Sequence, residues 1–202
     1  MTHKTKYDDG KTSVWGKRKL GGYAGVKHTA KQIIDLIPNI DKYTLYVEPF
    51  AGYGEVAKLI QRDEMVLNDM SKFAIDELTK SFPNSIITSE DFITCMTKWD
   101  SKDTFFLIDP PWYNDIYSKN DKPFMDRTAL QYYVDIFEFL KTIKGNWILC
   151  ADKWEHDVKR ICTLSKYDNL ILKTEHRLLH GKIGVLLTSN MPFSIHTDWG
   201  KK

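Results

Sequence analysis

The feature that most restricts the fold of this chain is a short apolar run that ends in Asp109-Pro110-Pro111-Trp112. The run, Thr104-Phe105-Phe106-Leu107-Ile108, is too apolar and too short for anything but a strand buried on both faces. Proline cannot continue a strand ladder, so the chain must leave the sheet directly after Asp109. A strand of this kind is typical of a parallel sheet covered by helices, in which ligands bind at the carboxyl ends of the strands.

The residues after this strand combine hydrogen-bond acceptors with an aromatic face. Asp109 and the prolines would present a carboxylate and carbonyl oxygens, and Trp112 adds a flat ring beside them. Such a set suits a planar nucleobase that bears an amino group. A strand that merely ends in a proline-rich turn fits the same residues equally well, so the stretches upstream must distinguish between the two interpretations.

A strand, a glycine turn and the start of a helix are predicted between Tyr43 and Ile60. The strand covers Tyr43 to Glu48, and the turn is Pro49-Phe50-Ala51-Gly52-Tyr53-Gly54. This arrangement lets the backbone approach a nucleotide-like ligand closely. A second strand, Met65 to Asn68, ends at Asp69, about twenty residues after the turn, which is the spacing at which nucleotide-binding folds present an acid to ribose hydroxyls.

A third predicted strand, Ser85 to Thr88, is followed by Ser89-Glu90-Asp91-Phe92. At this strand end Asp91 could accept a hydrogen bond from the adenine of the same ligand, and Phe92 could form an apolar wall. An ordinary helix cap and a core residue are the alternative interpretation of this pair.

The rest of the chain continues the alternation of strands and helices. Helical spacing of apolar residues ends at Pro38 and recurs around Ala74 to Phe82, Leu130 to Leu140 and Trp154 to Cys162. Further strands are predicted at Asn146 to Ala151, Asn169 to Thr174 and Gly184 to Ser189, the last two joined as a hairpin. The sequence therefore predicts an α/β fold of three layers, with a seven-stranded, mostly parallel sheet that contains one antiparallel strand, in a single domain over residues 1–202.

Composition narrows the class of protein. With 42% hydrophobic residues and no apolar run near 18 residues, the sequence predicts no membrane span. The amino terminus lacks the apolar core of a signal peptide, and the three cysteines form no CxxC pair, so a cytoplasmic, reducing location is expected. Residues 1–31 carry a net charge of +6 and the remainder −4. We expect residues 1–18 to form a basic, partly disordered arm, which could contact phosphates or simply remain solvated.

In its motifs the chain resembles the Dam-like N6-adenine DNA methyltransferases over roughly residues 19–190. Residues 47–54 are similar to the cofactor motif of this family, residues 67–69 to its ribose-binding acid, residues 89–92 to its adenine-contacting motif, residues 109–112 to its catalytic motif and residues 185–190 to its closing strand. The resemblance implies a Rossmann-like methyltransferase fold and S-adenosylmethionine as cofactor. It further implies that the cofactor contacts are Tyr23, Lys27, Glu48, Pro49, Phe50, Ala51, Gly52, Gly54, Asp69, Met70, Asp91 and Phe92, and that the catalytic residues are Asp109, Pro110, Pro111 and Trp112.

Three departures from the family are visible. The amino-terminal motif, Tyr23-Ala24-Gly25-Val26-Lys27, is degenerate. Trp112 stands where the family usually has Tyr, which keeps a stacking face but removes a hydroxyl. Only sixteen residues separate Phe92 from Asp109, an interval in which the family typically inserts a target-recognition domain. Nucleic-acid contacts are therefore expected from residues elsewhere: Lys119, Lys122, Arg127, Arg177 and Lys182.

The activity implied by the resemblance is methyl transfer to the 6-amino group of adenine in DNA, in a chain of prokaryotic or phage origin. Asp109 and the Pro110 carbonyl would accept the two amino hydrogens, and Trp112 would stack on a flipped base. Adenine in RNA, or a catalytically silent nucleic-acid-binding module, are the alternatives, with cytosine or glutamine amino groups as minor ones. No metal is expected, because His176 and His180, although spaced i, i+4, lie around a predicted hairpin and not on a helix that would place both on one face.

Overall fold

The computed structural model describes residues 27–37, 39–60, 62–110, 129–152, 168–174 and 183–193 of the 202-residue chain. Its strands are β1 (Leu45–Glu48), β2 (Met65–Asn68), β3 (Ile86–Thr88), β4 (Thr104–Ile108), β5 (Asn146–Asp152), β6 (Asp168–Thr174) and β7 (Ile183–Ser189). Its helices are α1 (Lys27–Leu36), α2 (Ala57–Ile60), α3 (Lys72–Ser81), α4 (Phe92–Trp99) and α6 (Ala129–Leu140), with a 3-10 turn at Ile40–Lys42.

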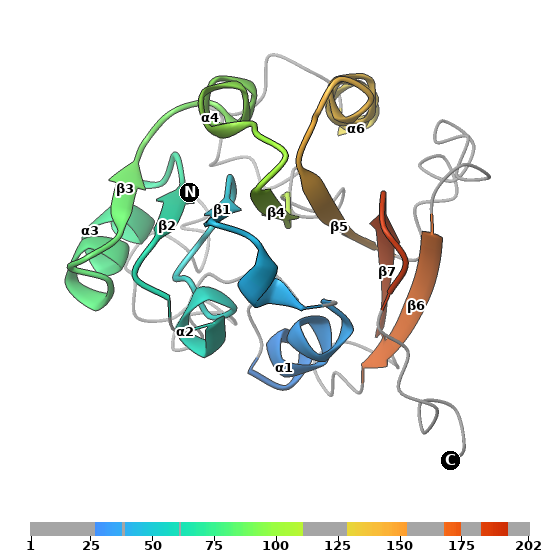
Figure 1. Cartoon of the computed structure of the whole chain (residues 1–202), viewed down its shortest axis with the longest axis horizontal. Helices are drawn as coiled ribbons and strands as arrows, with labels where there is room; N and C mark the ends of the chain where they lie inside the picture. The colour runs from blue at the N-terminus through green and yellow to red at the C-terminus, as the bar shows by residue number, and fades with distance from the viewer. Residues whose placement is uncertain are drawn as a thin grey trace, which may run out of the picture.

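The strands form one seven-stranded sheet in the order β3-β2-β1-β4-β5-β7-β6 (Figure 1). Neighbouring strands are parallel from β3 through to β5, and β7 is antiparallel to both β5 and β6. The predicted fold class is therefore confirmed, including the single antiparallel strand. The strand order reverses between β1 and β4, which is the place where open α/β sheets bind ligands.

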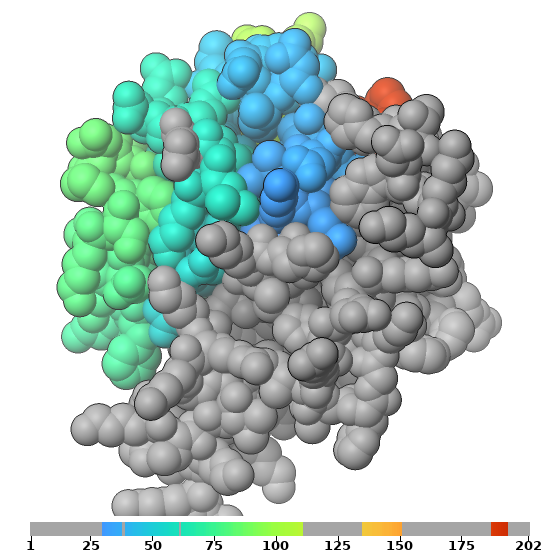
Figure 2. Space-filling view, turned by 90° about the horizontal axis from the view of Figure 1, so that it is seen from below, coloured from blue at the N-terminus to red at the C-terminus, as the bar shows by residue number. Residues whose placement is uncertain are grey.

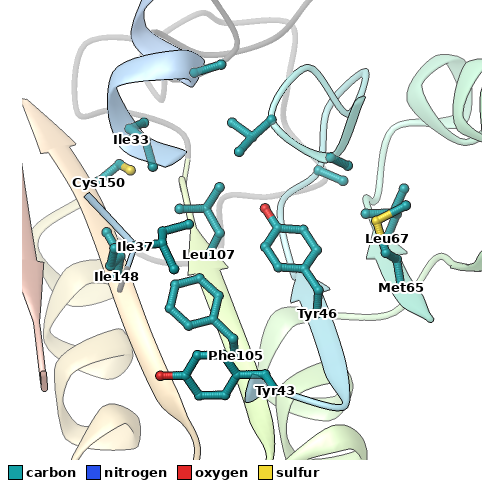
Figure 3. Close-up of a cluster of buried hydrophobic side chains, with 14 of the residues drawn as sticks. Ile33, Ile37, Tyr43, Tyr46, Met65, Leu67, Phe105, Leu107, Ile148 and Cys150 are labelled. Carbon is teal, nitrogen blue, oxygen red and sulfur yellow. The ribbon is translucent and has the colours of Figure 1, made fainter. Parts of the chain in front are cut away.

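One face of the sheet is covered by α1, α2 and α3 (Figure 1). The core on this face includes Ile33, Tyr46, Leu78, Phe105 and Cys150. Figure 3 shows Ile33 of α1 beside Cys150 of β5, and the Tyr46 ring stacks on Phe105 with centroids 6.1 Å apart. The described residues of the blue, teal and green parts of the chain lie next to one another on this side of the molecule (Figure 2).

The opposite face of the sheet is covered by α4 and α6 (Figure 1). Phe106 and Ile108 of β4 point into this second core, whereas Phe105 and Leu107 point into the first. All five residues of β4 are buried, as the sequence predicts for a strand with helices on both faces. Among the described residues, no helix has the length and apolarity needed to cross a membrane.

Several element ends differ from the prediction. Strand β1 begins at Leu45 rather than Tyr43, because Tyr43 closes the 3-10 turn through a hydrogen bond from its NH to the Ile40 carbonyl. Strand β3 begins at Ile86 rather than Ser85, whose NH bonds the Phe82 carbonyl. The last three strands are each one residue longer than predicted, because antiparallel pairing of β7 with β5 and β6 includes the added residues Asp152, Asp168 and Ile183.

Candidate functional site

Four predicted site segments meet at one edge of the sheet. Because β3, β2, β1 and β4 are adjacent and parallel, their carboxyl ends lie at the same edge. The segments that follow these ends are the glycine turn after Glu48, Asp69 after β2, Asp91 after β3 and Asp109 after β4. Residues spread over some sixty positions of sequence are thus gathered beside the reversal of strand order.

The glycine turn is closed by backbone hydrogen bonds. The Ala51 NH donates to the Asn68 carbonyl at 2.8 Å, and the Gly54 NH donates to the Ala51 carbonyl at 2.8 Å. Gly52 and Gly54 have φ of 53° and 68°, in the left-handed region that favours glycine. A Cβ on Gly54 would lie 2.6 Å from Cε2 of Phe82, the C-cap residue of α3, so packing against this ring also favours glycine there.

Asp69 connects this turn to the start of α3. One carboxylate oxygen accepts the Gly52 NH at 2.8 Å, and the other accepts the Ser71 NH at 2.8 Å. Burial raises the pKa of Asp69, and the hydrogen bonds from Ser71, Gly52 and Met70 counteract that rise. Asp69 therefore positions the turn, and its contact with a ribose stays a prediction.

Asn68 is a residue of this site whose role the sequence interpretation missed. Its amide NH₂ donates to the carbonyls of Pro49 at 2.9 Å and Glu90 at 2.8 Å, while its oxygen accepts from the Thr88 hydroxyl and the Glu90 NH, both at 2.8 Å. The side chain is 1% exposed and uses both of its donors and both lone pairs of its oxygen. One amide thus links the ends of β1, β2 and β3, and an asparagine that closes an apolar strand was the signal available in the sequence.

Asp91 and Phe92 adopt the structural roles that were the alternative interpretation. Asp91 is the N-cap of α4, where one oxygen accepts the NH groups of Ile93 at 3.0 Å and Thr94 at 3.1 Å, and the other bonds the Thr94 hydroxyl. Phe92 is buried, with its ring centroid 5.4 Å from that of Phe50. Contacts between this pair and an adenine stay a prediction.

Glu48 is a buried carboxyl group at the end of β1. It is 4% exposed, and the hydroxyl of Tyr46 donates to its Oε1 at 2.6 Å. Burial raises the pKa of Glu48 to about 8, and the negative charge of Asp109 adds to the rise. Asp109, which is partly exposed, and Glu48 therefore lie close enough to interact electrostatically.

Part of the predicted site lies outside the residues that the structure describes. Outside the described residues lie Tyr23, Pro111, Trp112, Lys119, Lys122, Arg127, His176, Arg177, His180 and Lys182. Of the predicted residues that the structure describes, Lys27 is the first residue of α1, Met70 is 47% exposed directly after Asp69, and Pro110 is buried directly after Asp109. Within the described ranges, no group of three or more His, Cys, Asp or Glu could hold a metal ion.

No family model and no curated protein matches the sequence. Among solved structures, a methyltransferase from Pyrococcus furiosus is similar, with a TM-score of 0.52 and 11% identity over 79% of this chain and 81% of that one. M. capricolum TrmK, solved with its cofactor product S-adenosylhomocysteine, has a TM-score of 0.51 and 11% identity over 84% of this chain and 71% of that one. A structure of WbdD has a TM-score of 0.55 and 8% identity, and this chain covers only 40% of it. These likenesses show that the chain has the Rossmann-like α/β fold found in methyltransferases.

Proposed function

We propose that this protein transfers a methyl group from S-adenosylmethionine to the 6-amino group of adenine in DNA. One observation supports the proposal above all others: the glycine turn, Asp69 and Asp109 follow three adjacent parallel strands at the reversal of strand order. This edge combines a glycine turn that a ligand can approach closely, the Asp69 carboxylate, which suits hydroxyl groups, and the Asp109 carboxylate, a hydrogen-bond acceptor followed by proline. Those are the parts that a nucleotide-like methyl donor and an amino acceptor require.

The described residues fit the adenosyl half of such a cofactor. The Asp69 carboxylate accepts backbone NH groups of Gly52, Ser71 and Met70. A carboxylate has about four lone-pair sites, so acceptor capacity remains for a ribose hydroxyl. Glycine at position 52 keeps the turn free of side-chain atoms where a ligand would approach. Met70, directly after the acid, is 47% exposed and offers an apolar contact to a base.

Asp109 and Pro110 would act on the amino group that receives the methyl. S-adenosylmethionine, when bound, supplies an electrophilic methyl group on a sulfonium sulfur. The lone pair of an adenine amine is delocalised into the ring, so the amine must be held in a geometry in which its nitrogen becomes tetrahedral. The Asp109 carboxylate and the Pro110 carbonyl would accept the two amino hydrogens, direct the lone pair and stabilise the developing positive charge. Trp112 would stack on the flipped base.

Recognition of DNA would take place without a separate recognition domain. The interval between Phe92 and Asp109 is used by α4 and β4 in the structure and leaves no room for a separate recognition domain. We therefore propose a short or relaxed target sequence, with affinity that falls steeply as salt concentration rises.

The test is to incubate the full chain and labelled S-adenosylmethionine with duplex DNA, single-stranded DNA or RNA, and to identify the labelled nucleoside. N6-methyladenine from DNA is the expected product, whereas label only in RNA would change the substrate class. If the protein binds the cofactor but labels none of the substrates, the result would instead support a catalytically silent binding module. Asp109→Ala should abolish the signal, and Asp103→Ala is its matched control, because Asp103 is an exposed aspartate at the opposite end of β4.

A further inference from the structure

Glu48 is a titratable group that the mechanism above does not use. Its position in the strand, two residues after Tyr46, directs its side chain to the sheet face covered by α1 and α2. The Tyr46 ring is fully buried beneath it, and the two side chains are joined by the 2.6 Å hydrogen bond. An acid buried at the end of β1, next to the proposed reaction site, therefore has a defined orientation.

Within the part of the chain that the structure describes, the charged and titratable groups around Glu48 come from four elements. Tyr46 lies on β1 itself, Asp109 follows β4, Cys150 lies on β5 and Lys58 lies on α2. Burial raises the pKa of Cys150 well above its usual value, so at neutral pH this thiol is uncharged. Lys58 favours the ionised form of Glu48, but its ammonium group pairs with Glu55 at 3.0 Å. Burial and Asp109 both act against a negative charge on Glu48 in the free protein.

A cation introduced beside Asp109 would reverse this balance. For methyl transfer to an amine held by Asp109, the sulfonium must lie near Asp109, and therefore within the electrostatic range of Glu48. A positive charge within about 6 Å lowers the pKa of a carboxyl group by roughly one to three. S-adenosylhomocysteine retains the amino acid and adenosine parts of the cofactor, but its sulfur is neutral.

We propose that Glu48, oriented by Tyr46, recognises the sulfonium charge of S-adenosylmethionine: it releases its proton when the cofactor binds and regains one when the sulfur becomes neutral. This inference rests on the proposed function and names the residue by which the site distinguishes cofactor from product.

The proton balance of a turnover is consistent with this role. The bond between methyl carbon and sulfur breaks, with its electron pair left on sulfur, while the amine lone pair forms the new bond between nitrogen and carbon. The methylated amine then loses one proton to the solvent, and the Glu48 carboxylate, no longer facing a cation, takes up one proton from the solvent. The protein therefore returns to its starting protonation state when the neutral product leaves, and cofactor affinity should rise with pH up to about 8.

The experiment is isothermal titration calorimetry of the full chain with S-adenosylmethionine, S-adenosylhomocysteine and sinefungin, whose protonated amine replaces the sulfonium. Each titration is repeated at pH 7 in buffers of different ionisation enthalpy, which gives the number of protons released. We expect at least about half a proton released for the two cationic ligands and less than half of that for S-adenosylhomocysteine. In Glu48→Gln the release should disappear, and the preference for S-adenosylmethionine over S-adenosylhomocysteine should fall by about tenfold.

Glu64→Gln is the matched control, because Glu64 is an exposed glutamate just before β2, at the far edge of the sheet. It should leave both the proton release and the preference unchanged. If Glu48→Gln does not fold, Tyr46→Phe provides a second variant: loss of the hydrogen bond should move the pH range of proton release upward. Binding of S-adenosylmethionine to the wild-type chain without proton release would overturn the role of Glu48 and leave the proposed function intact. Absence of any binding would overturn both.

Discussion

The backbone NH of Gly52 donates a hydrogen bond to Oδ2 of Asp69 at 2.8 Å, across 17 residues of sequence. This bond ties the turn after β1 to the acid after β2, so two segments predicted to contact one cofactor also support each other. A ligand that binds this edge would therefore meet a turn that is already held in place, which lowers the ordering cost of binding.

Replacement of Asp69 should weaken cofactor binding. Asp69→Ala removes the proposed ribose contact and leaves the Gly52 and Ser71 NH groups without their acceptor. We expect a loss of roughly 1.5–3 kcal/mol in binding free energy, the scale for hydrogen bonds to a charged group. Calorimetry measures the loss, with Asp76→Ala, an exposed aspartate on α3, as control. Unchanged affinity would show that Asp69 does not contact the cofactor.

Replacement of Asp109 should affect the chemical step rather than cofactor binding. Asp109→Ala should leave affinity for S-adenosylmethionine within a few fold and slow single-turnover methyl transfer at least about a hundredfold, roughly 2.7 kcal/mol of barrier. Asp103→Ala should transfer methyl groups at the wild-type rate. A near-normal rate in Asp109→Ala would exclude the acceptor role.

The stability of the free protein should depend on pH through Glu48. Its pKa is 4.5 when unperturbed and about 8 in the fold, so the unfolded chain loses this proton first as pH rises. The stabilising contribution is complete below pH 4.5 and is lost between pH 4.5 and about 8, at up to about 1.4 kcal/mol per pH unit. Urea denaturation of the wild-type protein and of Glu48→Gln across this pH range isolates the contribution of Glu48 to stability. Parallel pH profiles for the two proteins would show that Glu48 is ionised in the fold.

Removal of the Asn68 amide should destabilise the fold strongly. Asn68→Ala leaves the carbonyls of Pro49 and Glu90, and the NH of Glu90, without their partner in a buried place. The free energy of unfolding should fall by at least about 3 kcal/mol. Asn84→Ala, in an exposed turn, should change it by less than about 0.5 kcal/mol. An equally small effect for both variants would mean that water replaces the amide.

A methyl group at Gly54 should conflict with Phe82. Gly54→Ala combines a φ of 68° with a Cβ position 2.6 Å from the Phe82 ring, and we expect a loss of roughly 2–4 kcal/mol in stability. In a Phe82→Leu background the loss should be smaller by about 1 kcal/mol or more, because the steric part is relieved while the backbone strain remains. Equal losses in both backgrounds would assign the whole effect to backbone strain.

The fold was determined by patterns that act over short distances along the chain. The buried run at Thr104–Ile108 and the strand at Met65–Asn68 were predicted with their observed ends, because burial on both faces requires a continuous apolar stretch that polar residues or prolines terminate. The end of β1 nearest Tyr43 was predicted less well, since a local 3-10 turn competes there with the start of the strand. The alternation of strands and helices was sufficient to predict a parallel sheet with one antiparallel strand.

The tertiary structure alone decided how the strand ends interact. The sequence shows an asparagine that closes an apolar strand but does not identify Pro49 and Glu90 as its partners, because they meet Asn68 only once β2 lies between β1 and β3. The raised pKa of Glu48 has the same origin: it depends on the helices that exclude water from β1 and on Asp109 after the adjacent strand, whereas the hydrogen bond from Tyr46 counteracts the rise. The residue types at the site were thus set by the sequence, whereas hydrogen bonding and electrostatics depend on distances that the strand order creates.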